Sequence, residues 1–293
     1  MTLKRILLAS ITSLLLISCQ KGVDWATTTT STGSGTGSGG NGGGTTGDLL
    51  VKLVAVTGTD TFTVLYTYDA SKRLLTEDSK GTSGGMTIDI YQKFYRDANG
   101  RIYKISQLMK QPGMPSDTSF TNVYYPDATT LNFTYKTTDM SMMGLTTHDS
   151  TVYAWNASGN VTVANSFMTS ALLPGSVTMQ KYEYTYSNGN LTQQKSYSDI
   201  NTTGTPSLVA TYNYTFDNNT NPIIANGEFL LTGKTETASK NNVVKMEIVD
   251  ATTPSNSRTM TTSITYGTDG KPTKGTVTMQ PQGMVTKYTF FYQ

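Results

Sequence analysis

Residues 95–102 have the sequence Tyr-Arg-Asp-Ala-Asn-Gly-Arg-Ile. Asp97 can accept hydrogen bonds from its own backbone, and Gly100 can take a positive φ, so the segment predicts a tight turn. Just before it, Ile88 and Ile90 alternate with polar residues. Period-two alternation is typical of a strand with one buried face. The segment therefore predicts a β-hairpin.

Similar turns recur along the chain, and their markers at positions 69, 97, 127, 156, 187 and 217 are separated by 28, 30, 29, 31 and 30 residues. A constant step indicates a repeat in which each unit buries its apolar face only beside its neighbours. Lys72 stands where the first turn should have glycine, so we expect a positive φ there too. The predicted turn positions are Asp69, Asp97, Gly100, Asp127, Asn156, Gly159, Gly189, Asp217, Asp269 and Gly270.

Alternation continues to the end of the chain, as in Tyr288, Phe290 and Tyr292. Thr, Tyr, Val and Ile dominate these stretches, and they suit a pleated surface. We find no helical spacing of apolar residues outside the N-terminus. The sequence predicts one all-β domain over residues 48–293. It should be an antiparallel meander of repeated hairpins with about 12–14 strands, forming an open twisted sheet or a partial barrel.

The pattern aromatic-x-Tyr-Asp-x-x-Gly-Arg-Ile, matched best by residues 95–102, resembles the YD repeats of Rhs-type proteins. It is closer still to secreted lipoproteins of Gram-negative bacteria that carry a short array of such units. The resemblance implies a repeated β-hairpin fold and supplies no catalytic residues. Three departures are visible: Lys72 in a turn, Pro126 in the third unit, and a longer insert over residues 218–265.

The N-terminus predicts export and lipidation. Lys4 and Arg5 precede an apolar run of twelve residues, which is too short for a membrane-spanning helix of about 20 residues. Cys19, the one cysteine in the chain, follows Leu-Ile-Ser in the order of a lipobox. We predict a signal peptide over residues 1–18 and a lipidated Cys19. Residues 19–47 then form a Gly/Ser/Thr tether, with a reach of about 25 Å if it behaves as a coil.

The charge balance argues against nucleic acid. The chain has 22 basic and 20 acidic residues, and Lys4 and Arg5 leave with the predicted signal peptide. The mature chain is therefore neutral, whereas a nucleic-acid-binding surface carries a basic excess. We expect a membrane partner through the lipid and a glycan or protein partner through the domain. The expected location is the outer membrane, as a lipoprotein that faces the periplasm or the cell surface.

Catalytic and metal sites are not predicted. His148 is the single histidine and has no Gly-x-Ser-x-Gly segment to partner it, so we expect a surface loop residue. Met140, Met142 and Met143 could bind Cu(I), yet Met is frequent throughout the chain and also fills cores. The acids lie mostly in the predicted turns. We therefore expect no enzyme activity, no metal and no cofactor.

Two further residues are candidates for function. Trp155 lies at a predicted turn and could stack on a ligand. Ser150 lies in an Asp-Ser-Thr sequence that resembles a bacterial O-glycosylation site. The favoured function is a non-catalytic binding or scaffold lipoprotein of the envelope. An envelope enzyme acting on glycans and an outer-membrane β-barrel, whose strands also alternate, are the alternatives.

Overall fold

The computed structural model describes residues 49–83, 86–110, 112, 116–142, 145–170, 177–199, 204–221, 231 and 239–293. The predicted signal peptide, Cys19 and the tether lie outside these residues. The described residues form sixteen strands and one short 3-10 helix. The strands are β1 (Leu50–Thr57), β2 (Asp60–Tyr68), β3 (Leu74–Ser83), β4 (Met86–Arg96), β5 (Ile102–Lys110), β6 (Asp117–Tyr124), β7 (Tyr135–Met142), β8 (Leu145–Trp155), β9 (Val161–Ser170), β10 (Val177–Ser187), β11 (Asn190–Asp199), β12 (Ser207–Thr220), β13 (Asn241–Asp250), β14 (Arg258–Tyr266), β15 (Pro272–Gln280) and β16 (Met284–Tyr292), with the helix η3 at Pro254–Asn256.

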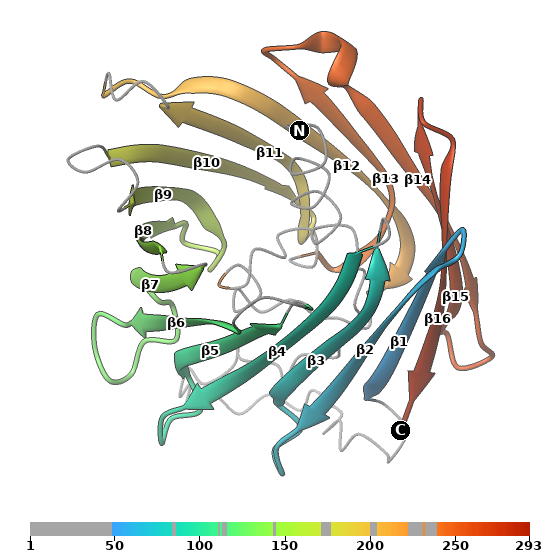
Figure 1. The fold of residues 1–293 in the computed structure, drawn as a ribbon, viewed down its shortest axis with the longest axis horizontal. Coiled ribbons are helices and arrows are strands. Elements are labelled where there is room, and N and C mark those ends of the chain that lie inside the picture. Colours follow the sequence, from blue (N-terminus) through green and yellow to red (C-terminus); the bar gives the residue numbers. More distant parts are fainter. Residues whose placement is uncertain are drawn as a thin grey trace, which may run out of the picture.

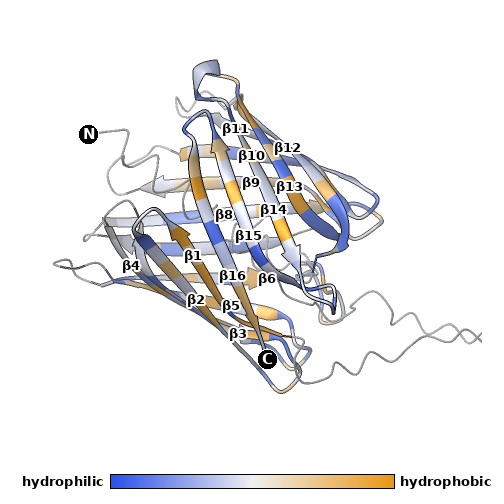
Figure 2. Cartoon of the chain, turned by 90° about the vertical axis from the view of Figure 1, so that its right-hand side faces the viewer, coloured by the Kyte–Doolittle hydropathy of each residue, from blue (hydrophilic) through white to orange (hydrophobic). Residues whose placement is uncertain are grey.

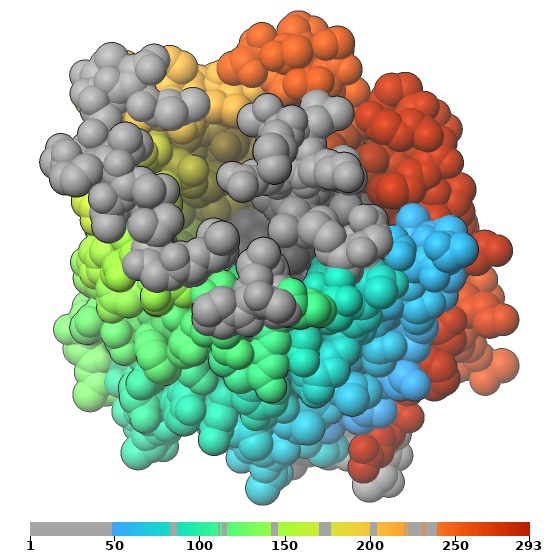
Figure 3. Space-filling view, in the orientation of Figure 1, coloured from blue at the N-terminus to red at the C-terminus, as the bar shows by residue number. Residues whose placement is uncertain are grey.

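Each strand pairs with its neighbours in sequence, and β1 pairs antiparallel with β16, so the described strands form a closed barrel. Figure 1 shows β1 beside β16, and in Figure 3 the blue and red ends of the chain meet on one side of the wall. The predicted all-β antiparallel meander is confirmed. The predicted strand number and the open or partial sheet are wrong: there are sixteen strands, and the seam between the first and last closes the sheet.

Alternation decides which side chains enter the barrel. In β2, Phe62, Val64 and Tyr66 are buried. The residues that alternate with them include Thr61, Leu65 and Thr67, which are exposed. The same alternation gives the other strands their inner faces, and the buried side chains form one core cluster. Leu231, between β12 and β13, belongs to this cluster. Its carbonyl oxygen accepts a hydrogen bond from Lys136 Nζ on β7 at 3.4 Å.

No helix among the residues that the structure describes is long and apolar enough to cross a membrane.

Several turns share one backbone design. In the turn after β4, Gly100 N donates to Asp97 O and Asp97 N donates to Arg101 O, both at 2.9 Å. The turn after β2 repeats both bonds, with Lys72 in the place of Gly100. Gly100 has a φ of 81° and Lys72 a φ of 62°. The two positions therefore adopt the same left-handed conformation, as their alignment in the sequence suggested.

A β-bulge follows each of five turns. The pairing of β4 with β5 shifts between Tyr95 and Arg96, which leaves Tyr103 as an extra residue on β5. An extra residue turns the strand so that two successive side chains share one face. Tyr103 and Lys104 thus both point outward, between the buried Ile102 and Ile105. The equivalent extra residues on the other strands are Leu75, Thr162, Thr192 and Thr273.

A side chain at the end of one strand bonds the start of a neighbouring strand, and this contact recurs around the barrel. Tyr68 Oη on β2 donates to Leu50 O at the start of β1, at 2.6 Å. Arg96 on β4 donates to Leu74 O at 3.5 Å. Arg96 therefore occupies the place of tyrosine in the Tyr-Asp pair, and Tyr95 is left on the outer face. Equivalent bonds join Tyr125 to Ile102, Trp155 to Phe133 and Tyr292 to Pro272.

The positive φ at Gly100 gives a testable prediction. Gly100→Val should lower the free energy of unfolding by about 1–3 kcal/mol, because a β-branched residue is strained in this conformation. Lys72→Gly, at the equivalent position, should be neutral or mildly stabilising. Urea denaturation of both purified variants measures the two effects. An unchanged midpoint for Gly100→Val would contradict the turn assignment.

Candidate functional site

Most of the predicted turn residues gather at one end of the barrel, which we call the turn end: it carries the turns after β2, β4, β6, β8, β10 and β14. Asp217, a predicted turn residue, lies within β12 instead. Leu49 and Gln293 also lie at the turn end, because each donates its backbone N–H to the carbonyl of the other. The predicted tether precedes Leu49. Any anchor on the tether therefore connects to the barrel at its turn end.

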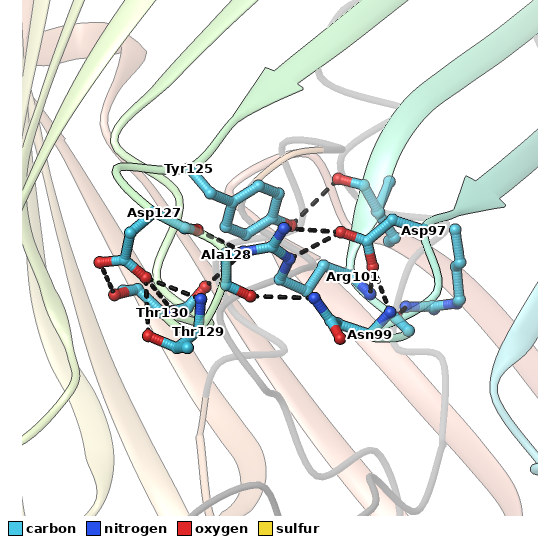
Figure 4. Close-up of polar contacts among 11 residues, drawn as sticks. Asp97, Asn99, Arg101, Tyr125, Asp127, Ala128, Thr129 and Thr130 are labelled. Atoms are coloured by element: carbon cyan, nitrogen blue, oxygen red, sulfur yellow. Dashed lines mark hydrogen bonds and ion pairs between the residues drawn. The ribbon is translucent and has the colours of Figure 1, made fainter.

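Asp97 and Arg101 form a connected polar contact at the turn end (Figure 4). Asp97 Oδ1 accepts the backbone N–H of Asn99 and of Arg101, at 2.9 and 3.0 Å. Its Oδ2 accepts Arg101 Nε at 2.8 Å. Burial opposes ionisation of Asp97, but the hydrogen bonds and charge of Arg101 prevail and lower the pKa of the carboxyl group.

Arg101 also joins its own turn to the next one. Arg101 Nη1 donates to Asp127 O at 2.7 Å and to Thr130 O at 3.0 Å. Its guanidinium lies 4.4 Å from the centre of the Tyr125 ring, a cation–π contact. Asp127 in turn accepts bonds from the side chains and backbone of Thr129 and Thr130, which lower the pKa of its carboxyl group. These groups are engaged within the protein, so the arrangement stabilises neighbouring turns.

Inside the barrel, tyrosines cover the wall between β8 and β12. Tyr184 is buried, and burial, together with neighbouring tyrosines, raises the pKa of its phenol well above the ordinary value. Lys136 faces the same interior, where burial lowers the pKa of its ammonium and Asp149 opposes that change. Asp149 also accepts hydrogen bonds from Ser166 and Thr151. The inward tyrosines of this wall are Tyr153, Tyr182, Tyr184, Tyr186, Tyr212 and Tyr214.

The outer wall carries charges in the middle of its strands, and exposed apolar side chains such as Val249 lie beside them. On β10, Lys181 Nζ lies 2.7 Å from Glu183 Oε1, and on β13 Lys245 Nζ lies 2.6 Å from Glu247 Oε1. Along the strands that face the viewer in Figure 2, hydrophilic and hydrophobic residues alternate. The wall between these charges is rich in threonine.

One part of the outer wall is rich in aromatic side chains. We name the aromatic strip after the outward rings of β4–β7. Tyr95 and Tyr103 have ring centres 6.5 Å apart, and those of Tyr124 and Tyr135 are 5.3 Å apart. Tyr103 and Tyr124 are each almost half exposed, at 46% and 47%. The strip consists of Tyr91, Tyr95, Tyr103, Phe120, Tyr124 and Tyr135.

Trp155 is not part of this strip. It is the last residue of β8, and its side chain points inward. Its Nε1 donates to Phe133 O at 2.7 Å, and its ring meets the Phe133 ring edge-on, with ring centres 5.1 Å apart. The indole is half-buried and packed against the core. Its contacts give it a structural role, and the exposed aromatics that sequence reasoning missed lie on the opposite face of the wall.

The other candidate residues lie on strands. His148 is on β8, not in the predicted loop, and points outward with Nδ1 2.6 Å from Asp139 Oδ1. Ser150 lies two residues further on, half-buried within the same strand. Met140 is an exposed strand residue, whereas Met143 lies outside the described residues. Among the described residues, no group of three His, Cys, Asp or Glu side chains could hold a metal ion.

No family model matches the chain, and no curated protein matches it in sequence. The chain is similar to a porin-like protein from Bacteroides uniformis, at 12% identity over 83% of this chain and 98% of that chain, with a TM-score of 0.50. A porin-like protein from Bacteroides vulgatus has 12% identity over the same shares and a TM-score of 0.41. A complex of TcdB2 and TccC3 has 15% identity over 80% of this chain and 14% of that chain, with a TM-score of 0.22. The first likeness indicates a shared barrel fold; the other two TM-scores are too low for a structural inference.

The bonded carboxylates predict acid sensitivity. Because the pKa of Asp69, Asp97 and Asp127 is lowered in the folded protein, they stabilise the fold above the unfolded value of about 3.9. That contribution is lost as pH falls below about 4. The urea midpoint should therefore drop between pH 5 and pH 3. Asp97→Asn should be less stable than the unchanged protein at pH 6 by about 1–3 kcal/mol. Its urea midpoint should fall less between pH 5 and pH 3. An equal fall of the midpoint in both proteins would contradict this role of Asp97.

Proposed function

We propose that the protein is a non-catalytic, lipid-tethered binding protein of the outer envelope, whose barrel stands in water beside the membrane. The observation that carries the proposal is the charge on the outer wall. In a membrane-embedded barrel the outward face is an apolar band about 25 Å tall. Here the middle of two strands carries charges on the outer face, where that apolar band would lie. The charged residues are Lys181 and Glu183 on β10 and Lys245 and Glu247 on β13.

The cost of immersing this wall in lipid supports the proposal. A single Lys or Arg on the lipid face near the midplane destabilises a barrel by about 2–4 kcal/mol. Lys93 and Lys104 add charge to the outer faces of β4 and β5, and Asp139 adds it on β7. Many such groups together exceed the usual stability of a domain, about 5–15 kcal/mol. The core cluster lies on the inner face, so its burial does not need lipid outside the barrel.

A non-catalytic role fits the chemistry of the described residues. The turn carboxylates are bonded to their own backbone and to arginine, and His148 contacts Asp139 on an open wall. The alternative of an enzyme that acts on glycans would need acids that converge on a substrate at a defined separation. The aromatic strip offers a binding surface without such acids.

An outer-membrane β-barrel is the second candidate. It is favoured by the closed ring of sixteen strands and by the likeness to the porin-like protein of Bacteroides uniformis. Both candidates predict recovery with the outer membrane. They differ in what holds the protein there: a lipid on Cys19 in the first, and the barrel wall in the second.

Cys19→Ala separates the two. If the anchor is the lipid, the variant should be exported and then recovered in the soluble envelope fraction, while the unchanged protein stays with membranes after alkaline carbonate. Ser18→Ala, which keeps a small residue before the cysteine, is the matched control and should remain anchored. Retention of Cys19→Ala in carbonate-washed membranes would overturn the proposal and favour the embedded barrel.

A further inference from the structure

We propose that the aromatic strip binds an acidic polysaccharide, stacking its sugar rings on the tyrosines and pairing its carboxylates or sulfates with Lys93 and Lys104. The inference rests on the proposed function, since it needs the outer wall to face water. The inference adds to that function the class of ligand that the outer wall binds.

The strip runs across the strands. Tyr95 lies on β4, Tyr103 on β5, Tyr124 on β6 and Tyr135 on β7, all near the turn end. Neighbouring strands lie about 4.8 Å apart, so the row is about 14 Å long from β4 to β7. Val152 on β8, paired with Tyr135 and 46% exposed, continues it. A linear row of rings on a convex wall suits an extended polymer with flat apolar faces, and sugar rings have such faces.

The bulge after β4 makes the row continuous. Because the bulge adds a residue to β5, Tyr103 joins Lys104 on the outer face. In a regular strand these two neighbours would face opposite sides. The ring of Tyr103 can therefore approach Tyr95, with their centres 6.5 Å apart.

Two lysines lie among the rings. Lys104 Nζ is 4.6 Å from the centre of the Phe120 ring and 5.9 Å from that of Tyr95. Lys93 Nζ is 5.0 Å from the Tyr95 ring. Among the described residues, neither ammonium has a carboxylate partner, unlike Lys181 and Lys245 elsewhere on the same wall. The rings hold the two cations in place and leave their charge available to an anion.

Other classes of polymer fit less well. A peptide that adds a strand needs a free sheet edge, and the described strands have none because β1 pairs with β16. Single-stranded nucleic acid also uses rings and cations, but it needs a charged groove along the backbone, whereas the chain without its predicted signal peptide has equal numbers of basic and acidic residues. An acidic polysaccharide needs only the rings and the two cations of the strip.

The test uses the Cys19→Ala full chain in affinity electrophoresis and calorimetry. The probes are polygalacturonate, alginate and chondroitin sulfate as acidic polymers, and dextran as the neutral one. At least one acidic polymer should bind in low salt, several-fold more weakly at 0.5 M salt, and dextran should not bind. Lys104→Ala and Tyr124→Ala should each weaken binding at least fivefold without changing the urea midpoint.

Lys52→Ala is the matched control. Lys52 lies on the outer face of β1, with its Nζ 5.2 Å from the centre of the Phe291 ring, but it lies outside the strip. Its removal should leave binding unchanged. The proposal is overturned if no acidic polymer binds, if dextran binds equally well, if oligo(dT) binds more tightly than every polysaccharide, or if Lys52→Ala weakens binding as much as Lys104→Ala. The release of Cys19→Ala from membranes tests the proposed function separately, so a failure of the ligand assignment can be told from a failure of the proposed function.

Discussion

At the turn after β4, the Asp97 carboxylate accepts two backbone N–H groups and one guanidinium N–H. Asp69 makes the same three contacts after β2, and Asn156 makes the two backbone contacts after β8. These hydrogen bonds fix the conformation of a five-residue turn in which one residue has a left-handed backbone conformation. The bulge that follows then sets which face of the next strand turns inward. Since a slip of one residue would move every apolar side chain to the other face, the face assignment of the whole wall depends on this local contact.

The hairpins are joined by bonds that each unit makes to its neighbour. Tyr68, Arg96, Tyr125, Trp155 and Tyr292 each bond a carbonyl at the start of an adjacent strand. Such carbonyls would otherwise lack a partner at the edge of the sheet. Tyrosine, arginine or tryptophan can make this bond, because it needs only a hydrogen-bond donor on an inward side chain that is long enough to reach the carbonyl. The closing pair of β1 and β16 then removes the last exposed edge.

Much of this could be predicted from local sequence. Alternation identified the inward faces of β4 and β16, and the step near 30 residues located most of the turns. The equivalence of Lys72 and Gly100 followed from spacing alone. Closure could not be predicted, because it depends on the pairing of residues such as Leu53 and Phe290, which are far apart in sequence. Strands within the insert over residues 218–265, such as β13 and β14, were also missed, which accounts for part of the shortfall in the strand number.

The candidate site shows a different limit. Trp155 is conspicuous in sequence, yet its Nε1 is needed by a backbone carbonyl of its own wall. Tyr103 and Tyr95 are less conspicuous. Alternation along β4 leaves Tyr95 outward and Arg96 inward. The exposure of Tyr103 depends on the bulge. The spacing of a repeat predicts which side chain sits at a turn, whereas a one-residue bulge decides which neighbour faces water.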